Sequence, residues 1–182
     1  MRFLKWFLVV AVALALIVIG GGYVLPGNVH VERSAVLQAD AGAIFPHINN
    51  LRRFHEWSPW AERDPNMKLE FTGPEEGVGA KMIWASERSD VGSGSQEIVE
   101  SAQSEKVVTA LDFGEMGKSR ASFQLQPEET GTKVIWALDA ELPANPFARW
   151  FGLFLDGMVG ADYEAGLTRL KAKVETPRPA GG

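Results

Sequence analysis

The chain has 182 residues, of which 46% are hydrophobic and 23% charged, a composition that suits one folded domain with a buried core and a short additional segment. It contains no cysteine, which excludes disulfides, thiol catalysis and thiolate metal sites. The formal net charge is −5, and because nucleic-acid binding needs a clustered cationic surface, nucleic acid is not an expected partner.

The first 27 residues predict a membrane-spanning helix. Arg2 and Lys5 precede an uncharged run of 20 residues, Trp6 to Leu25, and 20 helical residues span the ~30 Å hydrocarbon core of a bilayer. A cleaved signal peptide is the alternative, although its apolar region is usually only ~7–15 residues long. We favour an uncleaved single-pass anchor over residues 1–27. The positive-inside rule then predicts a cytoplasmic N-terminus and an extracytoplasmic, periplasmic domain.

A folded domain is predicted over residues 28–174, beginning with a strand at 29–38. Asp40 is placed to cap a helix from 41 to about 49, and Pro46 inside it predicts two short pieces. A second short helix is expected at 51–57, ended by Ser58-Pro59-Trp60.

Six further strands are predicted, separated by turns rich in glycine, proline and acidic residues. Short connections between successive strands indicate an antiparallel sheet. Alternation of apolar and polar residues predicts that one sheet face is buried and the other wet. The expected strands are 67–72, 80–86, 93–101, 106–113, 119–127 and 132–142.

A long helix is predicted at 145–174, where Asn145 can cap it and apolar residues recur at helical spacing. Four glycines interrupt it, and each marks either a close backbone approach or a loose point: Gly152, Gly157, Gly160 and Gly166. Residues 175–182 are expected to form a flexible tail. Strands followed by one long helix predict an α+β fold, with the helix laid across the apolar face of the sheet.

This order, together with local residues, resembles the START-like or SRPBCC superfamily, in its polyketide cyclase/dehydrase branch. The similar segments are VERS at 31–34, AIF at 43–45, LRRFHEWSPW at 51–60, GPEEGVGA at 73–80, GSGSQ at 92–96 and DYEAGL at 162–167. The resemblance covers about residues 28–174. It implies a helix-grip fold, in which a curved, seven-stranded antiparallel sheet wraps around the C-terminal helix with a cavity between them. Members bind lipids, sterols, polyketides or other apolar molecules, and a minority catalyse cyclisation or dehydration. The membrane helix is an addition to the family domain.

Large apolar side chains on the sheet and the last helix are the candidate ligand-binding residues, since ligand pockets are mostly apolar and aromatic. Ordinary core packing is the alternative for each of them. Trp57 and Trp60 either close the cavity mouth or fasten the short helices. The candidates are Trp57, Trp60, Met82, Trp84, Phe123, Trp136, Leu138, Phe151, Leu155 and Met158.

No catalytic residue is assigned from the sequence. Asp156, Arg149 and Tyr163 in the last helix are candidates for acid–base chemistry, with a solvated helix surface as the favoured alternative. The three histidines, at positions 30, 47 and 55, match no zinc motif, so no metal or cofactor is expected. No phosphate-binding loop and no nucleophile elbow is present.

These observations lead to three functional hypotheses. The favoured one is a membrane-anchored binding protein for a hydrophobic small molecule or lipid, held between the sheet and the C-terminal helix. The first alternative is a cyclase or dehydratase acting on an apolar substrate in the same cavity. The second is a scaffold or assembly factor with a filled core.

Overall fold

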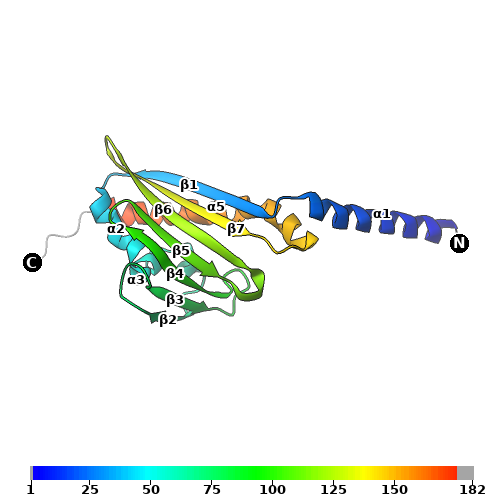
Figure 1. Ribbon diagram of the computed structural model, residues 1–182, viewed down its shortest axis with the longest axis horizontal. Coiled ribbons are helices and arrows are strands. Elements are labelled where there is room, and N and C mark those ends of the chain that lie inside the picture. Colours follow the sequence, from blue (N-terminus) through cyan, green and yellow to red (C-terminus); the bar gives the residue numbers. More distant parts are fainter. Residues whose placement is uncertain (1, 176–182) are drawn as a thin grey trace, which may run out of the picture.

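The computed structural model describes residues 2–175. Most of the predicted flexible tail, 176–182, lies outside the described residues. A helix, α1 (Arg2–Val24), projects from one end of an α+β domain (Figure 1). The domain contains a seven-stranded antiparallel sheet with strand order β1-β7-β6-β5-β4-β3-β2, and a long C-terminal helix, α5 (Pro146–Glu175), packs against it. This is the predicted α+β helix-grip arrangement.

The seven strands agree with the predicted ones to within one or two residues at each end. Every neighbouring pair is antiparallel, and all neighbours except β1 and β7 also follow each other along the chain. The bounds are β1 (Asn28–Leu37), β2 (Lys68–Thr72), β3 (Lys81–Ala85), β4 (Ser93–Ala102), β5 (Lys106–Asp112), β6 (Lys118–Glu128) and β7 (Gly131–Glu141). A short 3-10 helix, η1 (Gly114–Met116), joins β5 to β6.

Three short helices follow β1: α2 (Ala41–Asn49), α3 (Leu51–His55) and α4 (Pro59–Arg63). Of these, α2 and α3 lie at the end of the sheet opposite α1 (Figure 1). The predicted break at Pro46 is wrong, because α2 continues through it. Ile44 and Ile48 are buried on either side of Pro46, and their burial outweighs the one backbone hydrogen bond that a proline removes.

The segment at 58–60 starts a helix, where the sequence predicted only the end of one. Ser58 is the N-cap of α4 and Pro59 its first residue, a position in which the missing N–H of proline costs nothing. The preceding helix α3 is capped by Asn50, whose Oδ1 accepts hydrogen bonds from the backbone N–H groups of Arg52 and Arg53. These caps bring α3 and α4 back over the buried face of the sheet.

The glycines of α5 are mostly points of close approach. A Cβ on Gly166 would lie 2.7 Å from the ring of Trp136, and one on Gly160 would collide with the guanidinium group of Arg33. Gly152 likewise lies against Leu142, whereas Gly157 faces open space. Three of the four glycines therefore let α5 approach the sheet and its connecting loop.

Helix α1 is the one helix among residues 2–175 that is long and apolar enough to cross a membrane, over 22 residues from Phe3 to Val24. Its apolar side chains are largely exposed, with Leu8 at 63% and Leu16 at 65%. A signal sequence near an N-terminus has the same character, so α1 is consistent with either a signal sequence or an anchor.

Candidate ligand-binding cavity

A cavity of about 620 Å³ lies between the sheet, the middle of α5, and α3 with α4. Its walls come from β3 to β7, from the loop before β4, and from the α5 segment between Met158 and Tyr163. The rest of the space under α5 is filled. Leu167 and Leu170 of α5 are buried in the same core as Ile44 and Ile48 of α2. The space under α5 is thus hollow in its middle and solid towards its C-terminal end.

Six of the ten candidate ligand-binding residues line this cavity: Trp60, Met82, Trp84, Trp136, Leu138 and Met158. Trp84 reaches its position because Gly94 on the neighbouring strand has no side chain. A Cβ at Gly94 would lie 2.7 Å from the Trp84 ring. The edge of Trp84 then meets Phe113, with ring centroids 5.8 Å apart.

The other four candidates lie elsewhere. Trp57 and Phe123 are 2% and 1% exposed and belong to the filled core. The indole N–H of Trp57 donates to the backbone carbonyl of His47, 3.0 Å away, so Trp57 fastens α3 to α2, while Trp60 lies at the cavity wall. Phe151 and Leu155 are not in the wall, and Phe151 is 50% exposed. Burial on a helix depends on its rotation against the sheet, which sequence spacing did not fix.

A stack of two rings separates the filled core from the hollow part. Trp136 and Tyr163 lie parallel, with centroids 3.8 Å apart and planes 9° apart. Trp136 also stacks on Phe123 and meets the edges of Trp57 and Phe54. Its indole N–H is buried and has no hydrogen-bond partner within residues 2–175.

A charged pair forms one polar part of the wall. Arg63 of α4 donates two hydrogen bonds to the carboxylate of Asp162 on α5, one of them 3.0 Å long between Nη1 and Oδ2. The Asp162 side chain is 13% exposed and that of Arg63 37%. Bidentate pairing of this kind fixes both groups in one geometry. The sequence analysis missed both residues, although Asp162 lies one helical turn beyond Met158 and so shares its face of α5.

Neutral polar groups and an imidazole complete the wall. Gln96 is 5% exposed, and its side-chain amide donates to the hydroxyl of Thr109, 3.2 Å away. Ser58 and His55 face the cavity from α3 and the turn that follows it. Burial lowers the pKa of His55 below its ordinary value, and the nearby carboxylate of Glu56 opposes this shift only in part. The cavity is therefore apolar with a few polar groups set into it.

The catalytic candidates from the sequence are scattered by the fold. Asp156 lies outside the cavity and pairs with Arg33 of β1 at 3.0 Å, and this hydrogen bond lowers the pKa of its carboxyl. Arg149 lies at the end of α1. Tyr163 does line the cavity, and burial raises the pKa of its phenol far above the ordinary value, so it stays protonated. Of the histidines, His55 alone lines this cavity, and within residues 2–175 no three histidine or carboxylate groups could hold a metal ion.

A second hollow, of about 670 Å³, lies on the opposite, outer face of the sheet. Cross-strand neighbours there alternate in charge: His30, Asp139 and Arg120 follow one another across β1, β7 and β6. His30 Nδ1 lies 2.7 Å from Asp139, and this hydrogen bond raises the pKa of His30. This surface carries charged side chains of both signs, which does not suit an apolar ligand.

The fold and the cavity define a helix-grip domain with an apolar pocket under its C-terminal helix. The chain belongs to the polyketide cyclase/dehydrase and lipid transport family, which matches residues 28–175. No curated relative matches the chain at a significant level.

Solved structures share the fold at low sequence identity. Protein CV1439 from Chromobacterium violaceum superposes with a TM-score of 0.57 and 17% identity, covering 82% of this chain and 99% of its own. The di-domain ARO/CYC StfQ from the steffimycin biosynthetic pathway superposes with a TM-score of 0.62 and 13% sequence identity, covering 81% of this chain and 51% of its own. Ara h 8.0201 superposes with a TM-score of 0.56 and 11% sequence identity, covering 81% of this chain and 98% of its own. At these identities the likeness establishes the fold alone.

Proposed function

We propose that this protein is a membrane-anchored binding protein for an amphipathic hydrophobic molecule or lipid, held in the cavity under α5. The observation that carries the proposal is the partly open cavity of about 620 Å³, whose wall includes Trp60, Met82, Trp84 and Leu138. That volume lies within the ~300–1,000 Å³ range of pockets for small molecules. A filled core would have favoured the scaffold hypothesis instead.

The polar groups of the wall support an amphipathic ligand over a pure hydrocarbon. The Arg63–Asp162 pair and Gln96 provide hydrogen-bonding groups in an apolar surround. The buried N–H of Trp136 makes no hydrogen bond of good geometry within the described chain, and an unpaired buried donor costs about 1–3 kcal/mol. A ligand oxygen reaching this part of the wall would offset that cost.

The anchoring half of the proposal rests on α1. Its apolar length of 22 residues corresponds to ~33 Å of helix, enough for the hydrocarbon core of a bilayer. Arg2 and Lys5 favour a cytoplasmic N-terminus, so the domain would lie on the periplasmic side.

A second candidate, a cyclase or dehydratase, is favoured by one specific observation. Asp162 is a mostly buried carboxylate in the cavity wall, within the same cavity as His55 and Tyr163. An acid–base mechanism needs titratable groups of this kind beside an apolar substrate. The structural neighbour StfQ is itself an ARO/CYC protein, and the family of this chain includes both polyketide cyclases or dehydrases and lipid transport proteins.

The test is ligand occupancy of the full chain. Protein purified in mild detergent is analysed by native mass spectrometry for bound molecules and then titrated with a fluorescent fatty acid. Trp60, Trp84 and Trp136 in the wall serve as energy-transfer donors. Saturable energy transfer at one site per chain supports binding. No copurified molecule together with no saturable transfer refutes it, and turnover of a bound polyketide-like probe would favour the enzyme.

A further inference from the structure

The first half of α5 carries an apolar stripe that the domain does not bury. Phe147, Phe151, Phe154 and Met158 recur at spacings of four, three and four residues, so they lie on one face of the helix. They are 69%, 50%, 64% and 54% exposed. Single exposed apolar residues are common, but a continuous run of this size marks an interaction surface. We call these four residues the α5 stripe.

The α5 stripe begins where α1 ends. The guanidinium group of Arg149 donates to the backbone carbonyls of Tyr23 and Leu25, 2.9 and 3.1 Å away, at the C-terminal end of α1. The indole N–H of Trp150 donates to the carbonyl of Val18 at 2.7 Å. A cation at this end of α1 also complements the helix dipole. These contacts fix the first turn of α5 against the last turns of α1.

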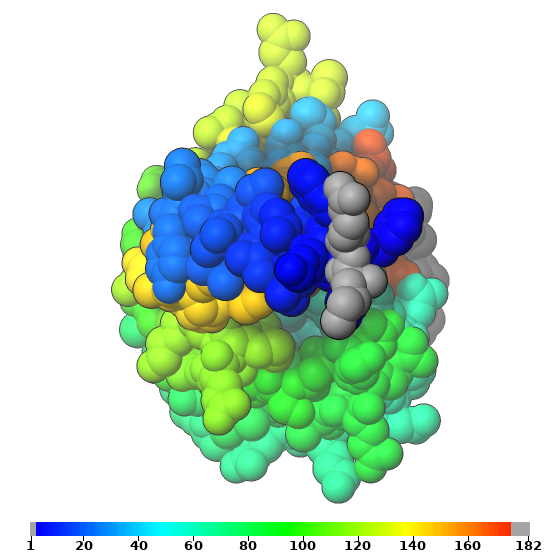
Figure 2. All heavy atoms as spheres, turned by 90° about the vertical axis from the view of Figure 1, so that its right-hand side faces the viewer, coloured from blue at the N-terminus to red at the C-terminus, as the bar shows by residue number. Residues whose placement is uncertain are grey.

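The glycines of α1 make this contact close. A Cβ on Gly21 would lie 2.9 Å from the ring of Trp150, and one on Gly22 would collide with Pro146. Figure 2 views the domain from this end, with α1 in blue nearest the viewer and the yellow segment that leads into α5 bordering it. The start of α5 is therefore held beside the apolar helix rather than exposed to bulk solvent on all sides.

The length of α1 places this junction at a membrane surface. If Phe3 to Val24 fill the hydrocarbon core, Tyr23, 60% exposed, reaches the interface, where tyrosine and tryptophan are enriched. Phe147 then starts at that level. Phe151 lies ~6 Å and Phe154 ~10 Å further along α5, at ~1.5 Å per residue. Phe147 and Phe151 therefore lie within reach of the headgroup layer, which is ~5–8 Å thick on each side of the bilayer, and Phe154 lies at its outer edge.

The stripe also leads to the cavity. Met158 is its last member and is part of the cavity wall, one helical turn before Asp162. An apolar path thus runs from the end of α1, along the stripe, to the wall of the cavity at Met158. This continuity with a bilayer-spanning helix favours a lipid surface as the occupant, since a second copy of the chain would not need the stripe to start at the anchor.

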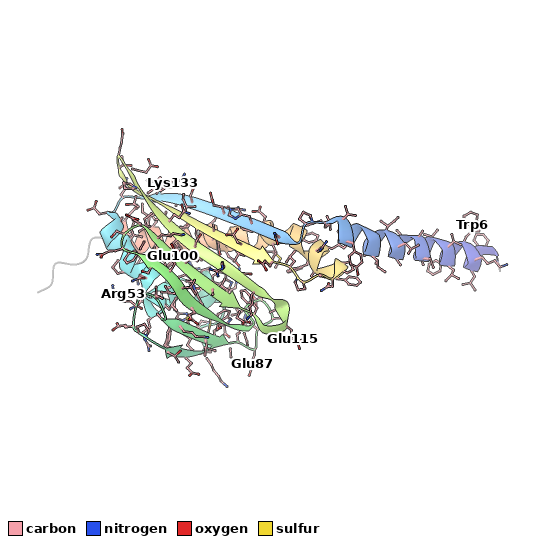
Figure 3. The ribbon with its side chains drawn as sticks, in the orientation of Figure 1. Trp6, Arg53, Glu87, Glu100, Glu115 and Lys133 are labelled. Atoms are coloured by element: carbon pink, nitrogen blue, oxygen red, sulfur yellow. The ribbon has the colours of Figure 1, made fainter. Side chains whose placement is uncertain are left out.

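Charges of both signs lie at this end of the domain, where Lys118 pairs with Asp112 at 3.2 Å and Arg88 with Asp90 at 3.0 Å. Glu115 in η1 and Glu87 before β4 lie at the end of the sheet nearest α1, whereas Lys133 lies at the far end (Figure 3). We infer that the α5 stripe docks on the surface of the bilayer that α1 enters, which holds Met158 and the adjoining cavity wall near the lipid phase. This inference rests on the anchoring part of the proposed function and is independent of whether the cavity is occupied.

The experiment uses the full chain in phosphatidylcholine nanodiscs. The absence of native cysteine allows single labels at Phe151→Cys, Phe154→Cys and three controls, each carrying an environment-sensitive fluorophore. Lys133→Cys reports the far end, Leu14→Cys reports insertion of α1, and Leu153→Cys is the matched control on α5. Leu153 is 56% exposed and lies next to Phe154 at nearly the same height, but ~120° around the helix from Phe147.

Docking predicts that nitroxide-bearing lipids quench the labels at 151 and 154 about twofold or more above those at 153 and 133. Equal quenching at 153 and 154 would mean mere proximity to the anchor and would overturn the inference. Labels at 151 and 154 as weakly quenched as at 133 would also overturn it, as would energy transfer between labelled chains, which indicates self-association. An unquenched label at 14 would refute anchoring and docking together, whereas failed docking with a quenched label at 14 leaves the proposed function intact.

Discussion

The indole ring of Trp136 on β7 lies flat against the phenol ring of Tyr163 on α5, with centroids 3.8 Å apart and planes 9° apart. Both residues are 2% exposed, and both line the cavity on one side while packing into the core on the other. This stack joins the sheet to the long helix at the point where filled core gives way to hollow. Its loss should therefore affect both stability and ligand binding.

Tyr163→Ala should lower the free energy of unfolding by about 3–5 kcal/mol, because it removes a large buried ring and leaves a void beside Trp136. Tyr163→Phe keeps the stack and should cost no more than about 1 kcal/mol. Urea unfolding of the full chain in detergent, followed by tryptophan fluorescence, measures both variants. A loss for the phenylalanine variant as large as for the alanine variant would show that the hydroxyl, and not the stack, holds this wall.

Gly166 and Gly157 form a matched pair on α5. Gly166→Ala should destabilise the protein by about 1–3 kcal/mol, since its Cβ would press on Trp136 at 2.7 Å and on Pro59 at 3.3 Å. Gly157→Ala meets open space and should stabilise it by up to about 1 kcal/mol through helix propensity. Thermal unfolding of the two variants checks the contrast. Equal effects at the two positions would contradict the close approach at Gly166.

The Arg63–Asp162 pair should respond asymmetrically to substitution. Arg63→Leu leaves the mostly buried Asp162 without its partner, a change that costs about 3–5 kcal/mol at buried pairs. Asp162→Leu leaves Arg63, which is 37% exposed and can turn to water, so the loss should be smaller, about 1–3 kcal/mol. A double-mutant cycle by urea unfolding measures the coupling. A larger loss for Asp162→Leu would contradict the burial of the carboxylate.

The pKa values of two histidines should be shifted in opposite directions from the ordinary value. The pKa of His55, lowered by burial, should lie below 6.5, and that of His30, raised by its hydrogen bond to Asp139, above 6.5. For His55 the unfolded chain binds the proton first, so stability falls as the pH drops from 6.5 through the folded pKa. For His30 the stabilisation is complete below 6.5 and is lost as the pH rises through the folded pKa.

Imidazole NMR resonances of the full chain in detergent measure these two pKa values. His55→Gln should remove the acid-side decline in stability attributed to His55, and filling the cavity with ligand should lower the pKa of His55 further, because it removes water from the imidazole. A value for His55 above 6.5 in the ligand-free protein would show that it is solvated and does not face a dry cavity.

Filling the cavity by mutation should compete with the ligand. Ala121 on β6 lines the pocket and is 4% exposed, so Ala121→Phe should weaken binding of a fluorescent fatty acid by about tenfold or more if the ring occupies ligand space. Ala110→Phe is the control, since Ala110 lies on the outer face of the paired strand β5 and does not line this pocket. Equal affinities for the two variants, with folding intact, would place the ligand elsewhere.

The local sequence was sufficient to predict the elements of this fold. Alternation predicted the strands at 29–38, 119–127 and 132–142, because one face of an antiparallel sheet is buried, and the turn residues between them delimited the other four. Asn145 and Pro146 predicted the start of α5, and the side chain of Asn145 accepts a hydrogen bond from the N–H of Ala148. Pro46 misled the prediction, because burial of its neighbours, which lies outside local propensity, decides whether a helix continues.

The cavity wall could be predicted only in part. The prediction correctly placed four strand residues on the inner face of the sheet: Met82, Trp84, Trp136 and Leu138. Side chains of a strand alternate between only two faces, and the apolar set takes the buried one. The buried face of helix α5 could not be chosen in this way, because apolar residues surround much of the circumference of the helix. Phe151 was therefore expected inside and lies outside, and Asp162 was not considered.

By itself the sequence determined the apolar N-terminal helix, the strand pattern and the long final helix, since each follows from the periodicity and length of a continuous segment. The tertiary structure alone decided how α5 is rotated, which glycines admit Trp136 and Arg33, and that Arg63 meets Asp162 across 99 residues of chain. These relationships depend on the packing of distant segments. The volume left empty between them is set by the shapes of all the surrounding side chains together, which no local pattern encodes.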